Sequence, residues 1–457
     1  MDTIHPTTVY WFKSIDLPHS NSHSLLRLNI LVPERSLKEM VLELLVKFTQ
    51  TLISVASFIL IGVIIYNFVI FIIGYKRKRA TKSNPTELKK ITLIIPVKDE
   101  INSLPLIFES LKNIIYPRDL LETIFVVSRD SKRCIEACKK FLKDNGKWVK
   151  VLVDEGRGKP SALNLGLKHA SGEIVGIFDV DSILPKDILL KVSEAFSDGD
   201  VVAVQGVTKP YNENKNLLSK LVSMEEKAYL ALFLQPRSNL DLFLPFTGSG
   251  SFIKKDLLLK IGGWSETALA EDFELALRLF DNKIKIRLEP KISCQHEAAS
   301  KLTPYILQRL RWFRGYLQLL LRASKRLITL TPHWIDISII LASPILLSAS
   351  LIVFLYFLIS ADINSPVNLI KPFAWSLLIT AIPAFFYITS RLRTIGLKAL
   401  LIIPASAAYW LLESLTALTA LMMCLFRIKM EWIRTPKNGV MELIDDDLRG
   451  KLASSKA

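Results

Sequence analysis

The stretch EIVGIFDVD, residues 173–181, decides the fold, because an apolar run ends in two aspartates one residue apart. We predict a buried strand here, with Asp179 and Asp181 at its carboxyl end. Three similar apolar runs precede it: ITLIIPV (91–97), TIFVVS (123–128) and WVKVLV (148–153). Stretches of helical period, around 104–114, 133–142 and 161–169, separate them. Buried strands alternating with helices predict a parallel sheet covered on both faces.

Ligands bind an open parallel sheet at the carboxyl ends of its strands, and acidic residues follow three of the four predicted strands. The first ends in PVKDE (96–100), the second in Ser128-Arg129-Asp130 and the fourth in the DVD triplet. Asp179 and Asp181 can hold Mg²⁺ or Mn²⁺ against a diphosphate, because hard cations prefer oxygen ligands. The alternative for such a triplet is a solvated strand end.

A glycine-rich segment, DEGRGKP (154–160), lies between the third and fourth predicted strands. Two glycines and Lys159 ahead of a helix suit phosphate binding by backbone N–H groups and one ammonium. A surface turn is the alternative. The Walker A pattern is absent, which argues against a P-loop nucleotide hydrolase.

The next polar segments are TGSGS (247–251) and Ala270-Glu271-Asp272, the latter at the start of a stretch with helical period. Asp272 is either the N-cap of that helix or a general base that removes a proton from an acceptor hydroxyl. QRLRW (308–312) follows on another helical stretch. Arg311 can neutralise a leaving diphosphate and Trp312 can stack on a sugar. A snorkelling arginine and an interfacial tryptophan are the alternatives.

Long apolar runs flank this region, at about 52–75, 335–360, 372–390 and 397–426. The first carries no charge and is long enough to span a bilayer; the last contains Glu413, which should face protein or a polar pathway. The net charge of +16 is concentrated beside these runs, as in 76–79, which predicts a cytosolic α/β domain at anionic lipid. We expect no nucleic-acid partner. Four cysteines form no metal spacing, consistent with reduced thiols.

Taken in order, PVKDE, GKPSALN, DVD, TGSG, AED and QRLRW resemble the motifs of membrane-integrated family-2 glycosyltransferases of GT-A fold, such as cellulose, hyaluronan and mannan synthases. The resemblance covers about 91–312 and resumes at WIRTPK (432–437). It implies an α/β, Rossmann-like, mostly parallel sheet domain inserted between transmembrane helices. Where the family has an Asp pair after the second strand, this chain has Ser128-Arg129-Asp130, which leaves the base of the donor open, with UDP favoured.

The resemblance also implies residue roles. Those implied for binding the nucleotide-sugar are Pro96, Lys98, Glu100, Asp130, Lys159, Asp179, Gln308, Arg311 and Trp312. Asp179 and Asp181 would hold Mg²⁺ or Mn²⁺. Gly248, Ser249, Gly250 and Trp312 would form the acceptor site. Asp272 is the implied base, with Glu271 beside it as the second catalytic carboxylate.

We therefore expect an inverting enzyme of the cell membrane, multi-pass, that moves a sugar to a polysaccharide or lipid-linked acceptor with a β-linkage. A single-transfer glycolipid enzyme, a non-catalytic nucleotide-sugar-binding scaffold and a transporter are the alternatives. The expected regions are a polar N-terminal region (1–47), a transmembrane helix (48–75), a cytosolic transferase domain (90–300), interfacial helices (301–333), transmembrane segments (334–426) and a tail (427–457). Three simple spans would place that tail outside, whereas the resemblance and Arg427 favour the cytosol.

Overall fold

The computed structural model describes residues 37–76, 87–155, 158–327, 331–360 and 402–428. The chain divides into two units, residues 1–59 and 60–457, and the α/β domain lies in the second. Several expectations fall outside the described residues: the N-terminal region up to residue 36, the basic run after Lys76, the apolar run at 372–390 and the WIRTPK segment.

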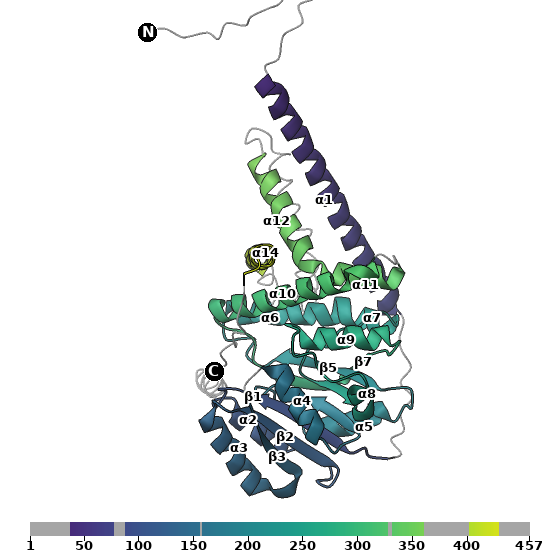
Figure 1. Cartoon of the computed structure of the whole chain (residues 1–457), viewed down its shortest axis with the longest axis vertical. Coiled ribbons are helices and arrows are strands. Elements are labelled where there is room, and N and C mark those ends of the chain that lie inside the picture. Colours follow the sequence, from purple (N-terminus) through teal and green to yellow (C-terminus); the bar gives the residue numbers. More distant parts are fainter. Residues whose placement is uncertain (1–36, 77–86, 156–157, 328–330, 361–401, 429–457) are drawn as a thin grey trace, which may run out of the picture. The chain divides into compact units, whose positions relative to one another are not determined.

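A seven-stranded mixed sheet forms the centre of the domain (Figure 1). Its strands, in spatial order, are β3 (Val149–Asp154), β2 (Leu121–Ser128), β1 (Ile91–Val97), β4 (Ile174–Ile177), β6 (Ser251–Lys254), β5 (Ala203–Pro210) and β7 (Arg287–His296). The four strands predicted from the sequence are present and mutually parallel. β6 runs antiparallel between β4 and β5, while β7 pairs in parallel with β5. The sheet is therefore mostly parallel and mixed.

β4 is shorter than the predicted strand at 173–181, because it ends at Ile177. Its partner β6 pairs only with 174–177, and the turn before β6 closes the ladder when the Gly250 N–H donates to the Ile177 carbonyl at 2.8 Å. The DVD triplet consequently leaves the sheet as a loop at the carboxyl edge. Gly248 and Gly250 both have positive φ, 84° and 73°, which this turn requires.

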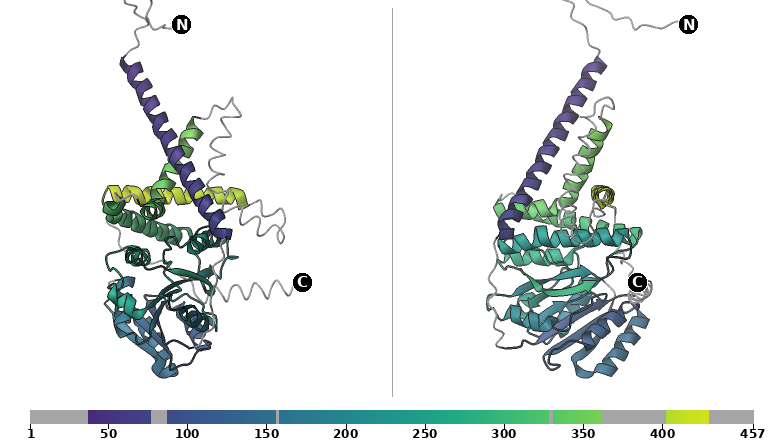
Figure 2. Two further views of the ribbon diagram at one scale, coloured as in Figure 1. Left: turned by 90° about the vertical axis from the view of Figure 1, so that its right-hand side faces the viewer. Right: turned by 180° about the vertical axis from the view of Figure 1, so that it is seen from behind.

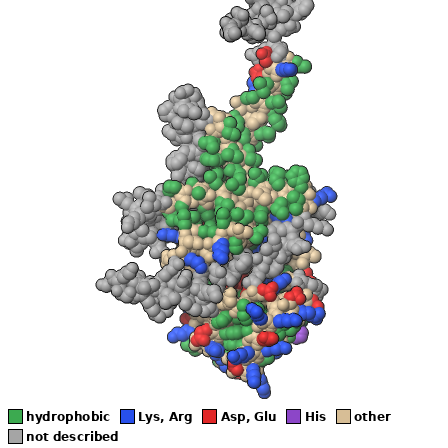
Figure 3. All heavy atoms as spheres, turned by 90° about the vertical axis from the view of Figure 1, so that its left-hand side faces the viewer, with side chains coloured by type: hydrophobic (Ala, Val, Ile, Leu, Met, Phe, Trp, Pro, Cys, Tyr) green, Lys and Arg blue, Asp and Glu red, His purple; other side chains and the backbone are tan. Residues whose placement is uncertain are grey.

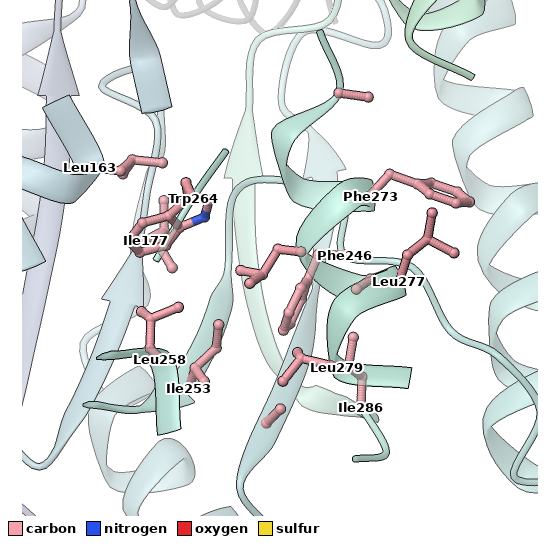
Figure 4. Packing of buried hydrophobic residues seen from close by; sticks show 14 of the residues in the cluster. Leu163, Ile177, Phe246, Ile253, Leu258, Trp264, Phe273, Leu277, Leu279 and Ile286 are labelled. Atoms are coloured by element: carbon pink, nitrogen blue, oxygen red, sulfur yellow. The ribbon is translucent and has the colours of Figure 1, made fainter. Parts of the chain in front are cut away.

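Alternate residues of the central strand enter two separate hydrophobic cores, as a strand period of two dictates. Ile94 of β1 belongs to one core, and its neighbours Leu93 and Ile95 belong to the other. The first core includes residues of α4 (Lys159–His169) and α9 (Glu271–Asp281) and is shown in Figure 4. The second includes residues of α2 (Leu104–Lys112), α3 (Lys132–Asn145) and α5 (Ile188–Phe196). Burial on both faces explains why these strands are continuously apolar.

The remaining helices of the domain follow β5, β6 and β7. They are α6 (Leu217–Ala228), a π-helix η2 (Tyr229–Leu234), α7 (Gln235–Asn239), α8 (Lys255–Lys260) and the long α10 (Leu302–Leu327), and a single 3-10 turn η1 (Gly146–Trp148) precedes β3. α6, η2 and α7 run on without a break. α10 has the helical stretch that carries QRLRW, as predicted.

Two described helices are long and apolar enough to cross a membrane, Leu37–Tyr75 and Pro404–Leu425, within α1 (Leu37–Lys76) and α14 (Ile402–Leu425). A third candidate is a helix pair bent by 61°, α11 (Pro332–Leu341) and α12 (Ser343–Ile359). Pro344 follows the break, where a residue without an N–H cannot continue the ladder. α1 begins at Leu37, eleven residues before the predicted start at 48.

Surface composition differs between these helices and the domain within residues 60–457. Apolar side chains gather over the helices in Figure 3, whereas lysine, arginine and acidic side chains cover the α/β domain. Exposed residues of α12 include Ile352, Leu355 and Ile359. A continuous apolar surface of this kind suits contact with lipid. Figure 2 shows α12 and α14 from two further sides.

Candidate functional site

Lys159 joins side chains from three separate stretches of the chain. It is the first residue of α4, and Gly158 before it has a φ of 121°, open to glycine alone. The Lys159 ammonium lies 2.7 Å from Asp179 Oδ1 and 3.8 Å from Glu271 Oε1, with its side chain 19% exposed. Although burial alone would lower it, Asp179 and Glu271 raise the pKa of Lys159 above its usual value. The lysine therefore stays charged.

Asp272 lies at the second position of α9, so it is not the N-cap, which is Ala270. One of its oxygens accepts the Phe273 N–H at 2.8 Å. Burial raises the pKa of Asp272 to about 7, and the charge of Glu271 adds to this, while Lys159 and Arg311 act in the opposite direction. A carboxylate whose pKa lies near neutral pH is suited to accept a proton.

The TGSG turn packs against this cluster. A Cβ added to Gly248 would stand 3.3 Å from Asp272 Oδ2 and 3.6 Å from Lys159 Nζ, so the backbone comes close to both charges. The Ser249 hydroxyl accepts the Asp179 N–H at 3.3 Å and lies 3.0 Å from the Ser182 hydroxyl. Ser249 is buried and thus joins the turn to the DVD loop, which leaves glycine backbone facing the cluster.

The helix α10 packs directly on the segment that leads into Glu271. A Cβ on Gly315 would meet Ala270 Cβ at 2.8 Å, so glycine permits this contact. The Gln318 side chain accepts the Leu269 N–H at 3.0 Å and donates to the Thr267 carbonyl, also at 3.0 Å. These contacts hold α10 against the segment that precedes Asp272.

The three QRLRW residues named as ligands, Gln308, Arg311 and Trp312, are all half-buried. The charge of Arg311 reaches Asp272, where it opposes the rise of the carboxyl pKa. Trp312 has the guanidinium of Arg309 over its ring, 4.6 Å from the centroid. Arg311 therefore stays a predicted ligand whose charge acts on the candidate base.

A narrow pocket opens beside the cluster. Its polar lining is Lys159, Gly248, Ser251, Glu271 and Asp272. Its apolar lining is Leu163, Ile177, Phe246, Ile253, Trp264 and Leu275. Figure 4 shows Trp264 close to Leu163 and Ile177, and Phe246 nearer to α9. Apolar walls with a few converging charges are the usual form of a small-molecule site.

The residues predicted at the ends of β1 and β2 lie along the same sheet edge. Val97 pairs with Val127, so the two strands end side by side. The Asp99 N–H donates to Ser131 Oγ at 2.9 Å, and that hydroxyl donates to Asp99 Oδ1 at 2.7 Å. Pro96 at the end of β1 and Lys98 and Glu100 in the loop after it are half-buried, and Asp130 is exposed in the second loop.

An ion pair crosses the neighbouring strand ends, between the Arg129 guanidinium and the Glu155 carboxylate. Both side chains are more than half exposed. Arg129 is the residue at which this chain departs from the Asp pair of the resembled family. Its partner Glu155 is a residue that the sequence analysis did not single out.

The two DVD carboxylates have different surroundings. The Asp179 side chain is 42% exposed, whereas the Asp181 residue is 3% exposed and accepts the Glu297 N–H at 3.1 Å. Among the described residues, no three His, Cys, Asp or Glu side chains group closely enough to hold a metal. Mg²⁺ at phosphate sites commonly uses one or two carboxylates and completes its shell from substrate and water. One open and one buried carboxylate fit that arrangement.

Sequence reasoning missed a second charged cluster, around Arg309. The sequence places this arginine in a juxtamembrane basic run, but its side chain is buried and pairs with Glu225 of α6. Glu413 of α14 lies 3.3 Å from Arg309 Nε and is also buried. The one available signal was Glu413 itself, an acidic residue in an apolar run that requires a partner.

The family model described as glycosyl transferase family group 2 matches residues 174–388. A probable glycosyltransferase of Bacillus subtilis, YdaM, is 27% identical over 239 residues, 51% of this chain and 57% of that protein. A poly-beta-1,6-N-acetyl-D-glucosamine synthase of Staphylococcus aureus is 25% identical over 55% of this chain and 60% of that protein. A beta-monoglucosyldiacylglycerol synthase of Synechocystis is 28% identical over 50% of this chain and 47% of that protein. The chain thus spans about half the length of these relatives.

Among solved structures, a mannosyltransferase of Pyrobaculum calidifontis, PcManGT, in complex with GDP-Man and Mn²⁺ has the same fold. The TM-score is 0.58 at 20% identity, covering 83% of this chain and 99% of that one. Its likeness bears on the fold alone. The family match over 174–388, the relatives and the shared fold together support a family-2 glycosyltransferase with a GT-A fold.

Proposed function

We propose that this chain transfers a sugar from a nucleotide-sugar donor to a glycan or lipid acceptor at a membrane. The observation that carries the proposal is the convergence of Asp179 and Glu271 on Lys159, which lines one apolar-walled pocket together with Glu271 and Asp272. Such a cluster combines a base of raised pKa with a cation, which are the two charges that transfer from a diphosphate requires.

The proposed reaction is a single in-line displacement at the anomeric carbon, with inversion to a β-linkage. Asp272 accepts the proton of the acceptor hydroxyl as its oxygen attacks that carbon. The bond from the carbon to the diphosphate breaks, and Lys159 and Arg311 take up the negative charge that develops on the leaving group. Glu271 raises the pKa of Asp272 and holds Lys159 in place.

Asp179 and Asp181 are the residues that would hold a divalent cation in this proposal. A bound Mg²⁺ or Mn²⁺ would supply positive charge beside the diphosphate. The Mn²⁺ in the mannosyltransferase complex supports a metal requirement without deciding between the two ions. The first loop residues Pro96, Lys98 and Glu100, together with Asp130, would contact the nucleotide from the neighbouring strand ends.

The acceptor would enter from the side of the TGSG turn and α10. Gly248 brings its backbone against Asp272, and the half-buried Trp312 offers a ring on which a sugar can stack. Gln308 lies one turn from Trp312 on α10 and would close over the diphosphate with Arg311. Relatives whose names specify a polysaccharide and a glycolipid product support both acceptor classes.

The proposal is tested by a donor screen with the full chain in purified membranes. UDP-sugars and GDP-sugars are supplied with and without EDTA, and released nucleotide and product size are measured. We expect sugar transfer with one donor, abolished by EDTA and restored by Mn²⁺ or Mg²⁺. A long product identifies a processive synthase, and a single sugar on lipid identifies a glycolipid enzyme. Donor binding without turnover for any donor would support the non-catalytic scaffold instead.

A further inference from the structure

Arg309 and Arg311 face opposite sides of α10, because residues two apart on a helix do not share a face. Arg311 acts on Asp272, whereas Arg309 is 6% exposed and directed at α6 and α14. Its Nη1 donates to Glu225 Oε1 at 3.0 Å, and its Nη2 donates to Glu225 Oε2. Both terminal nitrogens of the guanidinium thus bind one carboxylate.

The second carboxylate comes from the candidate membrane helix. Glu413 Oε1 lies 3.3 Å from Arg309 Nε and accepts the hydroxyl of Tyr305. Tyr409, one turn earlier on α14, donates its hydroxyl to Glu225 Oε2 at 2.6 Å. Three helices, α6, α10 and α14, therefore share one network of buried charges and phenols.

Close apolar packing surrounds this network. Leu310 and Phe313 of α10 form a buried cluster with Ala417 and Ala420 of α14. Small residues three apart on a helix let a second backbone approach closely. The contact fixes α10 against α14 along the face opposite to the cavity, and the charges determine its rotation.

We propose that Arg309 is a positioning residue for the transfer reaction. By binding Glu225 and Glu413 it sets the rotation of α10, and so holds Arg311 toward Asp272. Its guanidinium also lies 4.6 Å from the centroid of the Trp312 ring, and this contact orients the tryptophan directly. The proposal rests on the proposed function, and it makes the geometry of the leaving-group site depend on a membrane helix.

A second buried ion pair offers a matched control. Arg237 of α7 lies 2.8 Å from Asp336 of α11, and the two side chains are 1% and 3% exposed. Asp336 also accepts the hydroxyl of Tyr66 in α1 at 2.9 Å. This pair likewise joins the domain to candidate membrane helices. Neither the ion pair nor the tyrosine hydrogen bond involves a residue of the QRLRW segment.

The test compares Arg309→Lys, Arg309→Met and Glu413→Gln with Arg237→Lys in the full chain, in lipid nanodiscs. Donor affinity, kcat and KM are measured for folded enzyme. We expect Arg309→Lys to lower kcat about 10–100-fold, because misplacing a catalytic group by about 1 Å costs that much. Arg309→Met should lower kcat further. Glu413→Gln should lower it less, because the ion pair between Arg309 and Glu225 remains. Donor affinity should change under about 3-fold. Arg237→Lys should leave kcat unchanged.

Hydrogen exchange of the 308–316 amides supplies a readout independent of transfer. We expect faster exchange there in the Arg309 and Glu413 variants and wild-type exchange in Arg237→Lys. Unchanged exchange at 308–316 overturns the positioning role even if no donor is turned over. Wild-type protein that transfers no sugar defeats the proposed function alone. Equal losses of kcat and donor affinity, or equal losses in the Arg237 control, also overturn the proposal, because both indicate general destabilisation.

Discussion

Two buried cations organise the second unit of this chain, and they do different things. Lys159 faces Asp179, Glu271 and Asp272 beside an open cavity, and one of these partners is nearly half exposed. Arg309 faces Glu225 and Glu413 among packed helices, with every partner buried or half-buried. The first cluster borders a pocket and is partly open to solvent, whereas the second is enclosed by packed helices.

The choice of cation follows from that difference. An ammonium is a compact charge that can turn from a carboxylate to a diphosphate without breaking a fork of bonds. A guanidinium bound at both oxygens of a carboxylate gives a fixed direction and little freedom. Lysine therefore suits the position where charge must be redistributed during a reaction, and arginine suits the position where helices must be held.

The largest effect on transfer is expected from Asp272→Asn, in the lysine cluster. Removing the proton acceptor should lower kcat about 10²–10⁴-fold, the range of a well-placed general base. Donor affinity should remain nearly intact, since amide and carboxylate have the same size. Steady-state transfer and donor binding are measured side by side. Asp281→Asn, at the exposed far end of α9, is the matched control and should be neutral. A parallel loss of donor affinity would contradict the base assignment.

A somewhat smaller loss is expected from Lys159→Met, which leaves three carboxylates without their cation. Transfer should fall about 10²–10³-fold, because the leaving group loses a charged contact. Donor affinity should weaken as well, unlike in Asp272→Asn. Loss of the lysine also removes an interaction that lowers the pKa of Asp272, so the pH profile should shift to higher pH. Arg309→Lys should show no such shift, and a shift in both variants would erase the distinction between the clusters.

In the wild-type enzyme, kcat/KM is expected to change tenfold per pH unit on the acid side of its pH profile. Asp272 works as a base only when ionised, and its pKa in the free protein is raised to about 7. Log kcat/KM should therefore rise with unit slope below that pH and level off above it. Asp272→Asn should flatten this limb. A limb that persists in this variant would assign it to another group.

The smallest effect concerns stability and has the opposite sign to the effect on activity. Burial disfavours ionised Asp272, so the folded pKa lies above the unfolded value of 3.8. Stability from the neutral form is present at low pH and is lost as pH rises through about 7. Asp272→Asn should thus raise the free energy of unfolding at about pH 8.5, by at most about 4 kcal/mol, and change little near pH 4. Thermal midpoints at the two pH values measure this.

The parallel half of the sheet was predictable because its information is local. The four apolar runs specify their own strands, and Gly158 and Lys159 indicate the start of the helix that follows. Strand ends of one sheet edge must lie near one another, so the proximity of Lys159 and Asp179 follows from topology. The same reasoning allowed Asp272 to be either N-cap or base, and only the helix start at Glu271 excludes the cap.

The remaining features depend on pairings between distant segments. β6 is four residues long and antiparallel, and nothing in SFIK alone shows that it inserts between β4 and β5. The Arg309 partner Glu225 lies 84 residues away along the chain. A basic residue near apolar runs matches a juxtamembrane pattern, and burial is visible only once three helices are assembled.

Glu413 has a consequence for the biogenesis of the protein. An ionised carboxylate near the middle of an apolar helix opposes entry into lipid by about 2.5–3.5 kcal/mol on insertion scales. The contacts of Glu413 with Arg309 and Tyr305 offset this cost, and both partners lie on α10 of the α/β domain. We therefore expect α14 to pack in place only after α10 of the α/β domain has formed.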